Sequence, residues 1–145
     1  MRIHTYAAGD GRAVTHADVA PETVFAELIV VEAEERVYRV GDGLEIDVEL
    51  SVLEIFGELP GHVVTHRCRT VAITVSYAGR DVELTVHPAA HVKDVRAKAV
   101  EELQLDAGSS ADLVLRLPGA TTDLDPSHPI GSYVPKGTCE LTVDL

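Results

Sequence analysis

The stretch VAITVSYAGRDVELTVHPAAHVKDVRAKAVEEL, residues 71–103, decides the fold of this chain. Its first half alternates apolar with polar residues on both sides of a glycine-containing turn at residues 78–81. Such alternation predicts a β-hairpin with one apolar face. Six residues form this face: Val71, Ile73, Val75, Val82, Leu84 and Val86.

The second half of the stretch changes to the period of a helix. Pro88 ends the second strand because it has no amide hydrogen to donate to a ladder. His91 stands at the N-cap position, and Lys, Arg, Asp and Glu then occupy one side of the expected helix. We expect this helix to end near Leu105 and to bury a stripe formed by Val92, Val95, Ala99 and Leu103.

Two further strands are expected downstream. Residues 113–117 alternate again, and Pro118 and Gly119 end the strand that this alternation predicts. A Pro- and Gly-rich loop covers residues 120–137, and residues 138–145 predict a last strand with Leu141, Val143 and Leu145 on one side. The order hairpin, helix, strand, loop, strand predicts an α+β fold, in which one helix covers one face of a mixed sheet.

Several short motifs in this half occur in an order and at a spacing that resemble ubiquitin. They are Val86-His87-Pro88 before the helix, Asp94-Val95-Arg96-Ala97-Lys98 within it, Leu115-Arg116-Leu117-Pro118-Gly119, and Ile130-Gly131-Ser132-Tyr133 before the last strand. Each motif alone is weakly specific, but the resemblance covers residues 71–145 almost entirely. It implies a ubiquitin-like β-grasp domain, which is a fold that other proteins recognise.

The first half of the chain resembles a divergent copy of the second. Arg39 precedes Phe56 by the same 17 residues that separate Arg116 from Tyr133. Gly9-Asp10-Gly11 predicts a hairpin turn, and the apolar residues Val24, Phe25, Leu28 and Val31 predict a helix. We therefore expect two tandem ubiquitin-like β-grasp domains, residues 1–69 and residues 70–145, joined by a short linker without glycine.

Charge and composition restrict the class of partner and the compartment. The chain of 145 residues carries 24 acidic and 12 basic side chains, a formal charge of −12. This charge repels phosphate backbones and anionic lipid, so we expect neither nucleic acid nor a membrane as partner. Cys68 and Cys139 lie far apart, outside any C-x-x-C motif. We interpret them as two free thiols, which predicts a cytoplasmic protein.

No set of residues predicts catalysis, a metal site or a cofactor. His62, His66 and Cys68 are the nearest approach to a metal cluster, but further ligands at suitable spacing are missing from the sequence. His87 and His91 suit turn and capping roles beside Pro88. Gly9-Asp10-Gly11 and Gly41-Asp42-Gly43 lack the frame of a phosphate-binding loop. The acidic residues 32–35 are expected at a solvated helix end. We therefore expect a protein that is not an enzyme.

The resemblance to ubiquitin places two functional regions on this sequence. The apolar patch of ubiquitin corresponds to Arg116, to Asp144 and to the neighbourhood of Tyr77. An arginine and an acid there would deter the usual ubiquitin receptors, since an apolar groove would have to desolvate a guanidinium. We predict a dedicated partner that reads Tyr77, Arg116 and Asp144. The second region is a flexible tail that ends in glycine, for which Leu145 is the attachment point.

Two functions from different classes remain open. The first is a ubiquitin-like modifier whose partners are an E1-like activating enzyme, an E2-like conjugating enzyme and a JAB-type peptidase, as in bacterial antiphage operons. Only three lysines among many Ala, Val, Asp and Arg residues favour a GC-rich bacterial gene. The second is a non-conjugated adaptor in an assembly or secretion apparatus. Residues encoded after Leu145 would discriminate between the two.

Overall fold

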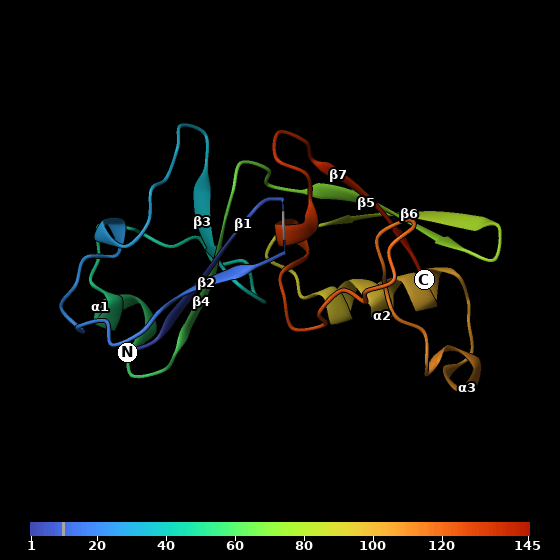
Figure 1. The fold of residues 1–145 in the computed structure, drawn as a ribbon, viewed down its shortest axis with the longest axis horizontal. Helices are drawn as coiled ribbons and strands as arrows, with labels where there is room; N and C mark the ends of the chain where they lie inside the picture. The colour runs from blue at the N-terminus through green and yellow to red at the C-terminus, as the bar shows by residue number, and fades with distance from the viewer. Residues whose placement is uncertain (10) are drawn as a thin grey trace.

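The computed structural model describes residues 1–9 and 11–145, except for the side chain of residue 107. The turn expected at Gly9-Asp10-Gly11 therefore includes a residue, Asp10, that lies outside the described residues. Two mixed sheets, each with few helices, form an α+β architecture (Figure 1). This is the fold class that the sequence predicts.

The sheet of the C-terminal half has the expected hairpin at its centre. Strand β5 (Val71–Tyr77) pairs antiparallel with β6 (Arg80–Val86) and parallel with β7 (Glu140–Asp144). A two-residue turn joins β5 and β6, and both Ala78 and Gly79 have positive φ, of 48° and 82°. Such a turn follows the right-handed twist of the two strands, which explains why a glycine stands in it.

Helix α2 (Val92–Glu102) covers one face of this sheet, as expected. Val92, Val95 and Ala99 are buried in one cluster with the apolar face of the hairpin. Arg96 fixes the segment that follows the helix: its guanidinium donates to the carbonyl oxygen of Leu113 at 2.5 Å and to that of Ser110. A short helix, α3 (Ala107–Ser110), lies in that segment, and the Asp106 side chain accepts a hydrogen bond from the amide of Ser109.

The strand expected at residues 113–117 is reduced to single bridges at Arg116. Arg116 pairs antiparallel with Asp144 on one side and with Asp123 on the other. The expected alternation is nevertheless present, since Leu115 is buried and Arg116 is exposed. The 3₁₀ helix η2 (Ile130–Tyr133) precedes β7 and contributes Ile130 to the same core.

The N-terminal half repeats the strand order of the C-terminal half. Strands β1 (Ile3–Ala7) and β2 (Ala13–His16) are antiparallel, and β4 (Gly61–His66) lies parallel to β1 with β3 (Arg36–Arg39) at its other edge. Helix α1 (Val52–Phe56) stands before β4 as η2 stands before β7. The 17-residue spacing in the sequence therefore corresponds to a repeated structural element.

The prediction of a helix around residues 24–31 is wrong. Only a 3₁₀ turn, η1 (Phe25–Glu27), is formed there. The amides of Phe25 and Ala26 donate to the carbonyl oxygens of Leu50 and Val48, at 3.0 and 2.9 Å. The amides of Glu27 and Leu28 then donate to the carbonyl oxygens three residues before them, at 3.0 and 2.9 Å, so the backbone forms a 3₁₀ turn and not an i to i−4 ladder. The acidic residues 32–35 accordingly lie in a turn and not at a helix end.

The interpretation of two free thiols is also wrong. Cys68 and Cys139 form a disulfide with 5.8 Å between their Cα atoms. Cys68 lies between β4 and β5, and Cys139 directly precedes β7. The bridge closes a loop of 71 residues and ties the link between the two sheets to the last strand.

Candidate partner-binding surfaces

The face of the second sheet opposite α2 is one candidate surface. Alternation along β5 and β7 directs Ser76, Thr142 and Asp144 away from the helix, since Val75 and Val143 are buried beneath it. The same face of β6 carries Asp81 and Glu83, and Ser76 donates a hydrogen bond to Asp81 at 2.7 Å. The surface is polar and rich in carboxylates, unlike an apolar receptor patch.

Arg116 and Asp144 meet on this face. They are two of the three residues predicted to contact a dedicated partner. The amide of each donates to the carbonyl oxygen of the other, at 2.8 and 2.7 Å. The guanidinium of Arg116 does not bond to Asp144 but forms an ion pair with Asp123, at 2.5 Å between Nε and Oδ1. The two side chains are 48% and 50% exposed, so their charges are available to a partner.

Tyr77 does not join this pair. It follows the buried Val75 by two residues on β5, so it points to the side covered by α2 and is half-buried. Its place beside Arg116 and Asp144 is taken by Ser76, whose carbonyl oxygen accepts from the amide of Leu145 at 2.9 Å. The predicted attachment point, Leu145, therefore lies next to the candidate surface, with its side chain partly buried against the core.

A second surface, which the sequence did not indicate, joins the two halves of the chain. In an ordinary one-helix sheet the second face is open, but here Tyr6, Tyr38 and Val64 on that face of the first sheet form a buried cluster with Ala89. The Tyr38 ring meets His87 edge-on at 4.5 Å between centroids, and Tyr6 meets His128 at 5.0 Å. We call this set of contacts the interdomain interface.

Main-chain hydrogen bonds cross the interdomain interface as well. The amide of Gly11 donates to the carbonyl oxygen of Ser132, and that of Gly41 donates to Ala89, both at 2.8 Å. Gly11 has a φ of +70°, and a Cβ at this position would overlap the ring of Tyr133. A glycine is therefore required here both by backbone conformation and by close approach.

His66 is the most buried ionisable group of the interdomain interface. Its Nδ1 accepts the amide of Cys68 at 3.0 Å, so the ring carries its proton on Nε2. Nε2 itself is buried and has no hydrogen-bond partner among the described residues. Burial is the main cause that lowers the pKa of His66. The Gly131 backbone and the charge of Glu35 oppose this shift, and the charges of Arg67 and His87 add to it. Burial also lowers the pKa of His87.

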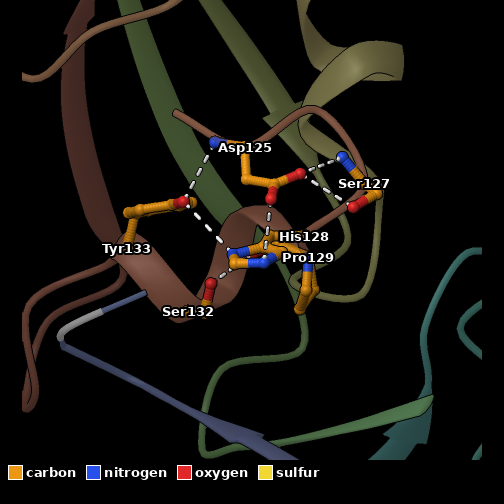
Figure 2. Close-up of polar contacts among 6 residues, drawn as sticks. All are labelled: Asp125, Ser127, His128, Pro129, Ser132 and Tyr133. Carbon is orange, nitrogen blue, oxygen red and sulfur yellow. Dashed lines mark hydrogen bonds and ion pairs between the residues drawn. The ribbon is translucent and has the colours of Figure 1, made fainter. Parts of the chain in front are cut away.

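Figure 2 shows a polar network within residues 125–133, in the segment before β7. Asp125 binds His128 Nε2 at 3.2 Å, and His128 Nδ1 lies 3.3 Å from the Tyr133 hydroxyl. That hydroxyl accepts the amide of Asp125 at 3.1 Å. The Ser132 hydroxyl donates to the carbonyl oxygen of Pro129 and not to the histidine. The network braces the loop.

The candidate metal ligands near the linker do not come together as a site. Cys68 is bonded to Cys139, and one nitrogen of His66 already accepts an amide. In the part of the chain that the structure describes, no three His, Cys, Asp or Glu side chains are grouped so as to hold a metal ion. Across the same residues, none of the helices combines the length and the apolar composition needed to cross a bilayer.

One signal in the sequence could have indicated the interdomain interface. Residues 61–66 read Gly-His-Val-Val-Thr-His, and four consecutive residues, 63–66, are buried. A strand with only one covered face should alternate, whereas a strand covered on both faces reads as a continuous apolar run. The adjacent Val63 and Val64 thus correspond to the two different clusters on either side of β4.

Comparison with known families agrees with the fold of the C-terminal half. Residues 72–145, just over half of the chain, match the family model described as BilA ubiquitin-like domain 2. A comparison with curated proteins found no match.

Proposed function

The chain belongs to the BilA family through this ubiquitin-like domain, and from that membership we propose that it is a ubiquitin-like protein modifier. The proposal places it in a bacterial conjugation system that acts against phage. The chain itself is not an enzyme in this scheme. Its partners are an E1-like activating enzyme, an E2-like conjugating enzyme and a JAB-type peptidase.

The direction of the last strand is the observation that carries this proposal. β5 begins beside the link to the first sheet and leads away from it, and β7 runs parallel to β5. The C-terminal end of the chain therefore points away from the N-terminal half (Figure 1). An enzyme that joins a modifier to its target acts at that end, so the first sheet does not obstruct it.

The open face beside Leu145 is the surface that we assign to the conjugation partners. Arg116 and Asp144 lie on it, together with the carboxylates of Asp81 and Glu83. The formal charge of −12 would attract a basic partner to the chain, and the carboxylates of this face would be among the groups that it meets. The usual ubiquitin receptors, which offer an apolar groove, would have to desolvate these charges.

The test is a search for covalent adducts in the native host. The chain, tagged at its N-terminus, should appear in adducts that survive denaturation and reduction, and mass spectrometry should find it joined to lysines of target proteins. Deleting the gene of the activating enzyme should remove the adducts. Arg116→Glu should lower their yield at least tenfold, whereas Lys98→Glu, the same charge change on the helix side, should not. Absence of adducts in the host with an intact operon refutes the modifier proposal.

A non-conjugated adaptor is the second candidate, and the coupling of the two halves favours it. The interdomain interface packs the first sheet against the second half of the chain, and the Cys68–Cys139 bridge anchors the link between the two sheets. Such coupling suits a binding module that holds a partner at a fixed angle. An adaptor should form a stoichiometric, non-covalent complex that native mass spectrometry detects. It should do so in a host that lacks the activating enzyme.

A further inference from the structure

A groove of about 590 Å³ opens on the first sheet. It lies on the face that corresponds to the one covered by α2 in the second sheet. Strand β2 and the segment of residues 28–35 form its two walls, and the ends of β1 and β4 form its floor. Six of the residues that line it carry the argument: Ala7, Val14, Leu28, Val30, Glu35 and Lys136.

The groove exists because the first sheet is only half covered. Val14 pairs with Thr5, so its side chain lies on the face of the sheet that also carries Ile3 and Val63. Ile3 and Val63 belong to the buried core. It is nevertheless 60% exposed, whereas Leu84 in the corresponding strand β6 is 7% exposed. In the second sheet α2 supplies the cover. In the first sheet η1 places only Phe25 over one end of the face.

The segment that replaces the helix forms a wall of the groove. Val30 on this segment is 87% exposed, and Leu28 and Ile29 are partly buried. Glu32 and Glu35 add acidic groups to this wall, Arg12 directly precedes β2 in the other wall, and Lys136 also lines the groove. The groove is thus an apolar channel that carries both acidic and basic groups.

We propose that this groove binds an amphipathic α-helix of a partner protein. The second half of the chain provides the model for this binding. There, α2 packs Val92, Val95 and Ala99 against the corresponding face of the second sheet. A partner helix would insert an apolar stripe at i, i+3 or i+4, and i+7 between Val14 and Val30. Basic side chains on one flank of the helix would face Glu32 and Glu35, and acidic ones on the other flank would face Lys136.

The inference is independent of the proposed function, since a modifier and an adaptor could each use the groove. It also predicts a binding site distinct from the open face of the second sheet. A partner could therefore hold the first sheet through the groove while another protein reads Arg116 and Asp144.

The experiment is site-specific photo-crosslinking in the native host, with a photoreactive amino acid in place of Val14. The expected adduct joins position 14 to a partner segment with the apolar spacing of an amphipathic helix. A photoreactive group in place of Val114, which is exposed in the other half of the chain, should not give this adduct. A crosslink to a second copy of this chain, a crosslink to a segment without helical spacing, or no crosslink at position 14 would each overturn the proposal.

The crosslinked segment, made as a synthetic peptide, provides the second measurement. Its circular dichroism should become helical on binding the intact chain. Val14→Asp should raise its Kd at least tenfold, and Val14→Thr, which keeps the shape and the β propensity, should raise it less. Val114→Asp should leave the Kd unchanged. A peptide that binds in an extended form along β2, or that binds Val14→Asp as tightly as the original chain, contradicts a helix in the groove.

Discussion

Arg116 and Asp144 exchange both main-chain hydrogen bonds, at 2.8 and 2.7 Å, so Arg116 extends the second sheet beyond β7 by one residue. Their side chains share one face, but the guanidinium bonds to Asp123. Main-chain hydrogen bonds therefore hold Arg116 in place. Its side chain contributes a half-exposed ion pair with Asp123.

The first prediction concerns the stability of that pair. Because an exposed ion pair contributes about 0.5 kcal/mol, Arg116→Ala should change the free energy of unfolding by no more than about that amount. Asp123→Ala should behave in the same way. Chemical denaturation followed by circular dichroism measures both values. A loss above about 2 kcal/mol for either variant would show that the pair is part of the core and not of a surface.

The second prediction tests the interdomain interface at Gly11. Gly11→Ala introduces a Cβ that overlaps the Tyr133 ring, at a φ of +70°. Gly119→Ala is a matched control, since Gly119 has a φ of +75° and no atom within 4 Å of the added Cβ. Both variants should lose about 1 kcal/mol from backbone strain, and Gly11→Ala should lose about 1–3 kcal/mol more from overpacking. Equal losses would mean that the two halves do not meet at this glycine.

The third prediction is a loss of stability in mild acid. The pKa of His66 lies below its ordinary value of 6.5 because the ring is buried. As pH falls below 6.5, the unfolded chain takes up a proton that the folded chain does not, so the free energy of unfolding decreases. Each such histidine contributes a slope of up to about 1.4 kcal/mol per pH unit until its folded pKa is reached.

Denaturant titrations between pH 7.5 and about pH 5, below the ordinary pKa of histidine, measure this slope. His66→Gln keeps an acceptor for the Cys68 amide but removes the titrating ring, so the loss on acidification should be smaller. Leu59→Gln, an exposed position outside the interdomain interface, serves as the control and should keep the original slope. A slope that His66→Gln leaves unchanged would assign the acid sensitivity to other groups.

The fourth prediction concerns the disulfide. A bridge that closes a loop of 71 residues should stabilise the fold by about 4 kcal/mol, chiefly by restricting the unfolded chain. Reductant should therefore lower the free energy of unfolding of the original chain by about this amount. The double variant Cys68→Ala, Cys139→Ala should be equally unstable with and without reductant. Insensitivity of the original chain to reductant would mean that the thiols are free in solution.

The sequence predicts best those elements whose evidence is local. The hairpin β5–β6 and helix α2 each carry a complete period of apolar residues and clear end signals at Ala78-Gly79 and Pro88, and all were found as predicted. The resemblance to ubiquitin, and not the alternation, placed Arg116 and Asp144 on one surface, and the structure pairs them. Such patterns are formed by residues that lie close together in the sequence, so they depend little on distant parts of the chain.

The errors arose where distant residues decide the structure. Residues 24–31 are apolar enough for a helix, but the backbone around Phe25 pairs with residues 48–51 instead. The distance between Cys68 and Cys139 in the sequence gives no sign of their pairing. The interdomain interface joins Tyr6, Tyr38 and Ala89, which no short motif connects. In each case a tertiary contact, and not a propensity, determines the outcome.

The parallel pairing of β5 and β7 also has a mechanical consequence. These strands begin and end the C-terminal half, and their hydrogen bonds join Ala72–Ser76 to the residues from Glu140 to Asp144. Once the Cys68–Cys139 bridge is reduced, pulling on the two ends of this half slides one strand along the other and loads the whole ladder at once, in shear. An antiparallel pair pulled from its open end would give way bond by bond. A protein-unfolding motor that grips the C-terminal end of the reduced chain must break this ladder before it can extend the residues between β5 and β7.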